Sequence, residues 1–282
     1  MCNRMTMVLT GAALAAMLLL AGIAAAAADE DGVTRYVRFQ KGDLVAYGLL
    51  EGQKVCRLEG PFGCWKPSDV VYALADVKLL VPSEPTKVLA CALNYRSHAG
   101  EQDLPEVPQL FFKPPSCLVA QGESIVIPEK AQRVDYEAEM VIVIRRRAKD
   151  VPEQKALDYV LGVTCGNDVS ERVWQKGDIQ WWRAKGADTF GPCGPVVVGG
   201  IDYGNLWLTL RLNGEVRQRQ NTRDLIFSVP EVVSFVSRHV TLEPGDLIYT
   251  GTPGKTSPIK PGDVVEVELE GVGVLKNPVA AP

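Results

Sequence analysis

Near the middle of the chain stands the run Asp135-Tyr136-Glu137-Ala138-Glu139-Met140-Val141-Ile142-Val143-Ile144. Its second half is apolar and rich in β-branched residues, which is typical of a buried strand. Side chains two positions apart in a strand point to the same face, so Glu137 and Glu139 are expected side by side. Two carboxylates that share a buried face repel each other and lose hydration, and a bound cation offsets both costs. The run therefore predicts a core strand that begins with two candidate cation ligands.

A second strand-like run, Val160–Asn167, ends directly before a third acid, Asp168. Three carboxylates together with water are ligands that Mg²⁺, Mn²⁺ or Ca²⁺ prefers, whereas softer metals do not. The alternative is that these acids are ordinary surface carboxylates at exposed strand ends. Spacing alone favours that alternative, so the metal hypothesis needs a further observation.

The rest of the chain is also rich in strand-like runs with alternating or β-branched residues. They are Thr34–Phe39, Leu44–Leu49, Val88–Leu93, Ser124–Ile127, Pro195–Val198, Leu206–Leu212, Val216–Gln220, Asp246–Thr250 and Val264–Leu269. Asn213-Gly214 separates two of these runs and predicts a tight hairpin. The expected helices are few and short, at Pro152–Tyr159, Ser170–Gln175 and Pro230–His239. This mixed α/β but β-rich pattern predicts a β-roll or sandwich and argues against a doubly wound parallel sheet.

The first 85 residues indicate a signal peptide and a domain boundary. Residues 1–28 carry Arg4, no acidic residue and the uncharged run Val8–Ala28, which predicts a cleaved signal peptide and export to the periplasm or beyond. An uncleaved membrane anchor is the alternative, because the uncharged run is just long enough to span a bilayer. The prolines of Pro82–Pro85 indicate a boundary between a small β-rich domain, residues 29–84, and a main domain, residues 85–282.

Composition restricts the function classes. The 282 residues are 46% hydrophobic, as in a globular protein, and 30 Lys+Arg against 34 Asp+Glu give a net charge of -4 without a basic block. A nucleic-acid partner is therefore not expected. Of seven cysteines, Cys2 lies in the expected signal peptide, Cys56 and Cys64 are a conceivable disulfide in an exported protein, and the others are expected as small buried hydrophobes.

Six stretches, in order along residues 86–282, resemble the fumarylacetoacetate hydrolase family. They are Leu93-Asn94-Tyr95-Arg96-Ser97-His98-Ala99-Gly100-Glu101, Phe112-Lys113-Pro114, Asp135-Tyr136-Glu137-Ala138-Glu139, Asn167-Asp168-Val169-Ser170-Glu171-Arg172, Lys185-Gly186-Ala187-Asp188-Thr189-Phe190-Gly191-Pro192 and Thr250-Gly251-Thr252-Pro253-Gly254. The resemblance implies a β-sandwich roll around a divalent cation and a homodimer. It also implies that Glu137, Glu139 and Asp168 hold Mg²⁺ or Mn²⁺, with Ca²⁺ as an alternative.

Further site residues follow from the same family positions. His98 and Glu101 are three residues apart, so on a helical turn Glu101 is expected to orient the imidazole, which acts as a general base. Lys185 is expected to stabilise oxyanion charge. Four residues are expected to contact the substrate, and Arg172 is suited to a carboxylate; the set is Tyr95, Arg172, Gln175 and Thr252. The other histidine, His239, is expected to be structural, at the end of a helix.

These expectations lead to a function hypothesis with alternatives. The chain is expected to be a metal-dependent hydrolase that cleaves a C–C bond in a β-diketo carboxylic acid, of the acylpyruvate or fumarylacetoacetate kind, through a metal-bound enolate. The alternatives within the family are an oxaloacetate-type decarboxylase and a 2-oxo-ene-dioate isomerase or hydratase. An alternative of another class is a secreted, non-catalytic protein that binds carboxylates through the metal, against which the presence of His98 and Glu101 argues. Lys255-Thr256-Ser257-Pro258 departs from the family pattern and is expected near the distal end of the substrate.

Overall fold

The computed structural model describes residues 32–282. The expected signal peptide, residues 1–28, lies outside the described residues. Within the described part of the chain, none of the helices combines the length and the apolar character that crossing a membrane requires.

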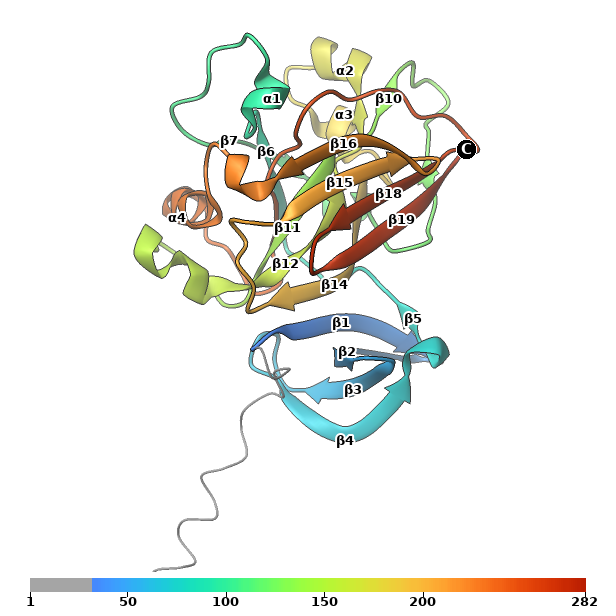
Figure 1. Cartoon of the computed structure of the whole chain (residues 1–282), viewed down its shortest axis with the longest axis vertical. Helices are drawn as coiled ribbons and strands as arrows, with labels where there is room; N and C mark the ends of the chain where they lie inside the picture. The colour runs from blue at the N-terminus through green and yellow to red at the C-terminus, as the bar shows by residue number, and fades with distance from the viewer. Residues whose placement is uncertain (1–31) are drawn as a thin grey trace, which may run out of the picture.

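Twelve strands form one large, mostly antiparallel sheet (Figure 1). Ten of them lie in the order β4-β3-β2-β1-β14-β12-β11-β17-β6-β7, with β5 beside β1 and β8 beside β14. Their bounds are β1 Thr34–Lys41, β2 Leu44–Glu51, β3 Lys54–Glu59, β4 Lys66–Ala73, β5 Lys78–Leu79, β6 Val88–Ala92, β7 Gln109–Lys113, β8 Leu118–Val119, β11 Ala138–Ile144, β12 Val160–Asn167, β14 Gly191–Gly199 and β17 Leu247–Tyr249. The pairs β17–β6 and β14–β8 are parallel.

A second sheet of five strands packs on the first. Its order is β16-β15-β18-β19-β9, with bounds β16 Glu215–Asn221, β15 Trp207–Leu212, β18 Val264–Leu269, β19 Gly273–Ala280 and β9 Ile125–Val126. Asn213 and Gly214 both have positive φ, as a two-residue hairpin requires, so the expected turn between β15 and β16 is confirmed. A separate two-stranded ladder joins β10 (Val134–Asp135) to β13 (Ser170–Glu171). The β-rich sandwich expected from the sequence is therefore present.

The alternation of side chains along β11 separates the core from the site. Met140 and Ile142 point into the hydrophobic core that includes Leu208 and Val267 of the second sheet. Val141 and Val143 belong to a different apolar cluster on the opposite face of the large sheet. Because Glu139 alternates with Met140, it lies on the Val141 side, away from the second sheet.

The helices are short and cover the ends of the sheets. They are α1 Arg96–Ala99, α2 Arg172–Gly177, α3 Trp182–Gly186 and α4 Val229–His239, with 3₁₀ turns at Leu74–Asp76, Pro115–Cys117, Glu153–Tyr159 and Thr222–Asp224. A capping box between Ser228 and Glu231 begins α4, and Pro230 occupies its first turn. The expected helix at Pro152–Tyr159 is a 3₁₀ turn, and the one at Ser170–Gln175 begins two residues later, because Ser170 and Glu171 pair with β10.

The N-terminal strands continue the large sheet. Strand β1 pairs with β14 from Thr34 opposite Gly199, and β1–β4 extend outward from there (Figure 1). Arg145 also donates a hydrogen bond from Nε to the Gly63 carbonyl at 3.2 Å. The segment therefore contacts the rest of the fold through both backbone pairing and side chains.

All six cysteines in the described residues are free thiols. The conceivable Cys56–Cys64 disulfide is thus not formed: Cys56 donates its thiol to the Ser68 carbonyl at 3.3 Å, and Cys64 is exposed. The other four are buried, as expected for small hydrophobic side chains.

Gly162 in β12 is a position where the fold admits no side chain. An added Cβ would overlap the Val198 carbonyl oxygen of the neighbouring strand β14. Gly162→Ala is expected to lower the free energy of unfolding by about 1–3 kcal/mol, because backbone on both strands must shift. Gly177→Ala is the matched control, since a Cβ there meets nothing within 4 Å and replacing a helical glycine is neutral or stabilising. Denaturant unfolding of both variants measures the difference, and equal stabilities would contradict the steric argument.

Candidate active site

The pairing register of β11 and β12 brings the three predicted acids together. Glu139 lies opposite Gly166, and one step further along the ladder the Asp168 amide donates to the Glu137 carbonyl at 2.9 Å. One carboxylate oxygen from each of Glu137, Glu139 and Asp168 lies within 4.8 Å of the others. All three residues are buried, so the alternative of exposed surface acids is wrong.

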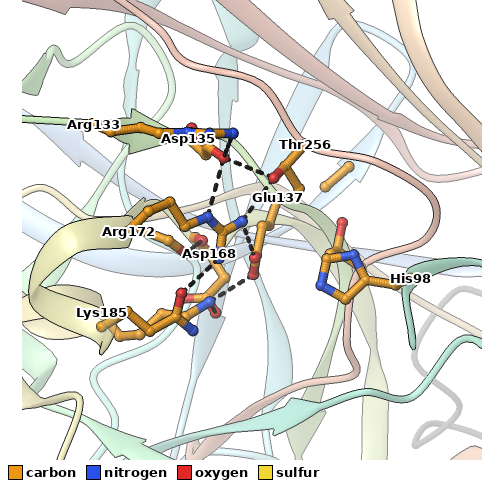
Figure 2. Close-up of polar contacts among 12 residues, drawn as sticks. His98, Arg133, Asp135, Glu137, Asp168, Arg172, Lys185 and Thr256 are labelled. Atoms are coloured by element: carbon orange, nitrogen blue, oxygen red, sulfur yellow. Dashed lines mark hydrogen bonds and ion pairs between the residues drawn. The ribbon is translucent and has the colours of Figure 1, made fainter. Parts of the chain in front are cut away.

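Two buried lysines neutralise part of this negative charge. Lys185 Nζ lies 2.6 Å from Glu137 Oε2 and 2.5 Å from Asp168 Oδ2, between the two carboxylates (Figure 2). Lys113 Nζ lies 2.6 Å from Asp168 Oδ1 and also donates to the carbonyls of Lys185 and Phe190. No role for Lys113 was predicted from the sequence. The Phe112-Lys113-Pro114 motif could have pointed to this lysine. The motif lies at the end of strand β7, which the sequence pattern did not predict.

The surroundings of Glu137 and Glu139 shift the pKa values of the two side chains in opposite directions. Burial on its own would raise the pKa of Glu137, but Lys185, Arg172 and His98 lower it to about 2. Burial, with Asp168 and Glu137 next to it, raises the pKa of Glu139 well above its ordinary value. The Glu139 carboxylate accepts a hydrogen bond from the Gly251 amide at 2.6 Å and has no direct cationic partner among the described residues. A buried site with oxygen donors and one uncompensated carboxylate fits a divalent cation such as Mg²⁺, Mn²⁺ or Ca²⁺.

The Arg172 guanidinium is fixed by groups of the protein itself. It donates to Glu137 Oε1 at 2.5 Å, to Asp135 Oδ2 at 3.1 Å and to the side chains of Gln175 and Thr256 at 2.9 Å each. Asp135 and Thr256 were not predicted as site residues, although Asp135 stands two positions before Glu137 in the run that holds two of the predicted metal ligands. Thr256 also donates to Asp135 at 2.8 Å. The segment 255–258, which departs from the family pattern, thus helps to hold the Arg172 side chain in place. Its expected place at the distal end of the substrate stays a prediction.

The structure does not bring His98 and Glu101 together. Helix α1 ends at Ala99, and Gly100 with a φ of 63° turns the chain away, which leaves Glu101 exposed and without a hydrogen bond to His98 in the described structure. The expected one-turn pair is therefore corrected. His98 Nδ1 instead lies 2.8 Å from the Gly254 carbonyl oxygen. Because a carbonyl only accepts, Nδ1 carries the proton and Nε2 is the basic atom of the neutral ring.

A cavity of about 450 Å³ lies beside the triad and joins most of the predicted residues. Its lining includes His98, Glu137, Arg172, Gln175, Lys185 and Thr252. The His98 ring lies across from the side chains of Arg172 and Lys185, with Glu137 between them (Figure 2). Tyr95 does not line this cavity. It is completely buried, and its hydroxyl has no hydrogen-bond partner in the described structure; its contact with the substrate stays a prediction.

Comparison with protein families gives two matches. Residues 87–280 match the model described as fumarylacetoacetate (FAA) hydrolase, C-terminal, and residues 34–82 match one described as Rv2993c-like, N-terminal. The first match covers more than half of the chain. The chain therefore belongs to the fumarylacetoacetate hydrolase family, as its motifs indicated.

Three relatives show which activities are named within this family. A structure described as 5-carboxymethyl-2-hydroxymuconate delta-isomerase from Mycobacterium smegmatis is 41% identical, with a TM-score of 0.83 over 88% of this chain and 100% of that one. Oxaloacetate tautomerase FAHD2A from Bos taurus is 39% identical over 74% of this chain and 71% of its own length. Maleylpyruvate hydrolase from Sphingobium sp. SYK-6, in complex with manganese (II) and pyruvate, is 26% identical, with a TM-score of 0.72 over 88% of this chain and 99% of that one. The relatives thus include isomerases, tautomerases and hydrolases.

Lys113 gives a prediction about the site. Lys113→Met is expected to weaken Mg²⁺ binding about 10–100-fold, the usual cost of losing a partner that orients a metal ligand, because Asp168 loses a charged donor. Lys87→Met is the control: it breaks a comparable 2.5 Å ion pair with Asp246, which is not among the predicted ligands. Calorimetric titration with Mg²⁺ distinguishes the two, and equal affinities in both variants would show that Lys113 has no such role.

Proposed function

We propose that this chain is a divalent-metal-dependent hydrolase that cleaves a C–C bond in a β-diketo carboxylic acid of the acylpyruvate type. The observation that carries the proposal is the buried triad of Glu137, Glu139 and Asp168, of which Glu137 lines the same cavity as His98. A hydrolase needs both a site for negative charge and a base for water, and this cavity offers both.

Glu137, Glu139 and Asp168 would hold the metal ion, which when bound supplies Lewis-acid stabilisation of the charge that develops on the substrate's oxygens. The residues of the chain account for the other requirements. Arg172 and Lys185 bring two fixed positive charges to the cavity, where they bind the carboxylate and the developing enolate oxygen of the substrate. Their side chains are held by Glu137, Asp135 and Asp168, so little reorganisation is needed when the charge appears.

His98 moves the protons. Its Nε2 takes a proton from water, whose oxygen attacks the distal carbonyl carbon, C4 of a 2,4-dioxo acid. The C3–C4 bond then breaks, and its electron pair stays on C3 as the enolate of the 2-oxo acid. The distal fragment leaves as a carboxylic acid, and C3 receives the proton that His98 had taken. The products are one carboxylic acid and one 2-oxo acid for each water consumed.

A second candidate is the tautomerisation of an oxaloacetate-like acid, which needs a base at C3 but no activated water. The exposed position of Glu101 favours it, because the His98–Glu101 pair predicted for activating water makes no hydrogen bond in the described structure. The similarity to oxaloacetate tautomerase also supports it. Decarboxylation and isomerisation of a 2-oxo-ene-dioate use the same enolate and remain alternatives in the family.

One set of assays tests the proposal. Purified protein with Mg²⁺ or Mn²⁺ is incubated with acetylpyruvate, and NMR follows the products. Equal amounts of acetate and pyruvate are expected, in amounts that depend on the metal. Faster conversion of enol to keto oxaloacetate without cleavage of any acylpyruvate would favour the second candidate, and carbon dioxide release from oxaloacetate would favour a decarboxylase.

A further inference from the structure

Two aromatic side chains separate the catalytic cavity from a second, outer cleft. The outer cleft has a volume of about 430 Å³, and its lining shares Phe111 and Trp181 with the catalytic cavity. The two rings meet edge to face, with centroids 5.2 Å apart and an interplanar angle of 71°. This Phe111–Trp181 pair is therefore a partition one side chain thick between two spaces of similar size.

The pair stands next to the charged part of the site. Phe111 alternates with Lys113 along β7, so both side chains point toward the carboxylates. The Phe111 ring centroid lies 5.3 Å from Lys185 Nζ, and the Lys185 amide donates to the Trp181 carbonyl at 2.9 Å. The Phe111–Trp181 pair therefore forms the wall of the catalytic cavity next to Lys185.

The outer cleft beyond the pair carries several exposed apolar side chains. Three of its side chains are among the most exposed hydrophobic residues of the described chain: Ile179 is fully exposed, Trp182 68% and Phe112 57%. Exposed apolar groups gathered beside a binding cavity are a usual sign of ligand contact. Phe111 and Trp181, which line both spaces, stand between this surface and the catalytic cavity.

We propose that the Phe111–Trp181 pair sets the greatest length of acyl group that the site accepts. This inference rests on the proposed function and adds the substrate class: acylpyruvates with a short acyl group. Removing the Trp181 indole joins the two spaces and lets a long acyl chain reach the apolar outer cleft. Each methylene transferred from water to that surface is expected to strengthen binding about fourfold.

The experiment measures kcat/KM for a series of acylpyruvates, from acetylpyruvate to decanoylpyruvate, with the Mg²⁺-loaded protein. The wild type is expected to favour the short members. Trp181→Ala is expected to raise the ratio of decanoylpyruvate to acetylpyruvate by at least about 100-fold, and Trp181→Phe to give an intermediate ratio. Trp207→Ala is the matched control, because Trp207 is a surface side chain on β15 that lines neither space.

Binding of the same acids is measured by calorimetry, independently of turnover. If no acylpyruvate is cleaved, the proposed function fails, but the dependence of Kd on acyl length still tests the partition. A length profile unchanged by Trp181→Ala in both assays would overturn the inference, as would a wild type that binds decanoylpyruvate as well as acetylpyruvate. If Trp181→Ala does not fold, Phe111→Leu thins the other side of the partition and is expected to shift the profile in the same direction.

Discussion

A Glu139→Gln variant is expected to lose more than about 100-fold of its Mg²⁺ affinity and yet to be more stable than the wild type when both are metal-free at neutral pH. The variant loses a ligand oxygen charge, which accounts for the weaker binding. It also removes a buried carboxylate that has no direct cationic partner in the described structure. The metal-free protein therefore gains stability from the same change that prevents metal binding.

The pH dependence follows from the raised pKa of Glu139. The unfolded chain releases this proton near the ordinary glutamate value, whereas the folded, metal-free chain holds it to higher pH because of burial, Asp168 and Glu137. The contribution of Glu139 to stability is therefore complete below the unfolded pKa and is lost as pH rises toward the folded one. Glu139→Gln should remove this loss, so that metal-free stability declines less between weakly acidic and neutral pH.

Glu137→Gln is the matched comparison, with the same chemical change and the opposite effect on metal-free stability. The folded pKa of Glu137 is about 2, below the ordinary value, because Lys185, Arg172 and His98 outweigh burial. Its contribution to stability is present above the unfolded pKa and is lost as pH falls toward about 2. Glu137→Gln should thus weaken both Mg²⁺ binding and metal-free stability at neutral pH. Thermal unfolding in chelator and calorimetric Mg²⁺ titration test both variants, and the assignment fails if Glu139→Gln binds Mg²⁺ normally.

A His98→Ala variant is expected to lose about 10²–10⁴-fold of its turnover rate, the usual contribution of a positioned general base. Its Mg²⁺ affinity should stay within a few-fold of the wild type, because His98 is not one of the three predicted ligands. Steady-state kinetics with acetylpyruvate and calorimetry with Mg²⁺ give the two quantities on the same preparation.

The second histidine provides the control for this change. His239 is exposed at the end of α4, with its ring 5.0 Å from that of Phe235, and His239→Ala should leave turnover unchanged. Glu101→Gln should also be nearly silent, since Glu101 is exposed and makes no hydrogen bond to His98 in the described structure. Near-normal turnover in His98→Ala would rule out His98 as the base and favour a reaction without activated water.

The sequence was informative about strands whose apolar residues are continuous or alternate with polar ones. The bounds of Val160–Asn167 and Val264–Leu269 agree with the structure, because buried strands consist of continuous or alternating apolar residues. Strands β3, β4, β7 and β19 were not predicted, since their patterns are broken by charged residues or prolines such as Arg57, Pro67 and Pro278. Their pairing is set by neighbouring strands rather than by their own composition.

Some residues of the candidate site could be predicted from the sequence, and others could not. Period-two spacing placed Glu137 and Glu139 on one face, and a strand end placed Asp168 next to them. Lys113 and Asp135 were missed because an ammonium and a carboxylate look like surface groups until a buried partner is known. The His98–Glu101 pair was expected from helical spacing, but the turn ends at Ala99, and a spacing rule does not reveal where a four-residue helix stops.

The alternation of acidic and apolar side chains at the start of β11 has a consequence for how the chain folds. A one-residue slip of this strand against β12 would turn Glu139 toward the apolar interface between the sheets and Met140 toward the lysines. Such misaligned pairings would bury a lone carboxylate among leucines and valines and would therefore be strongly disfavoured. The acids of the site thus help to set the register of β11 against β12 during folding. Substitutions that make β11 uniformly apolar would remove this preference for one register and are expected to yield more misfolded, aggregation-prone chains.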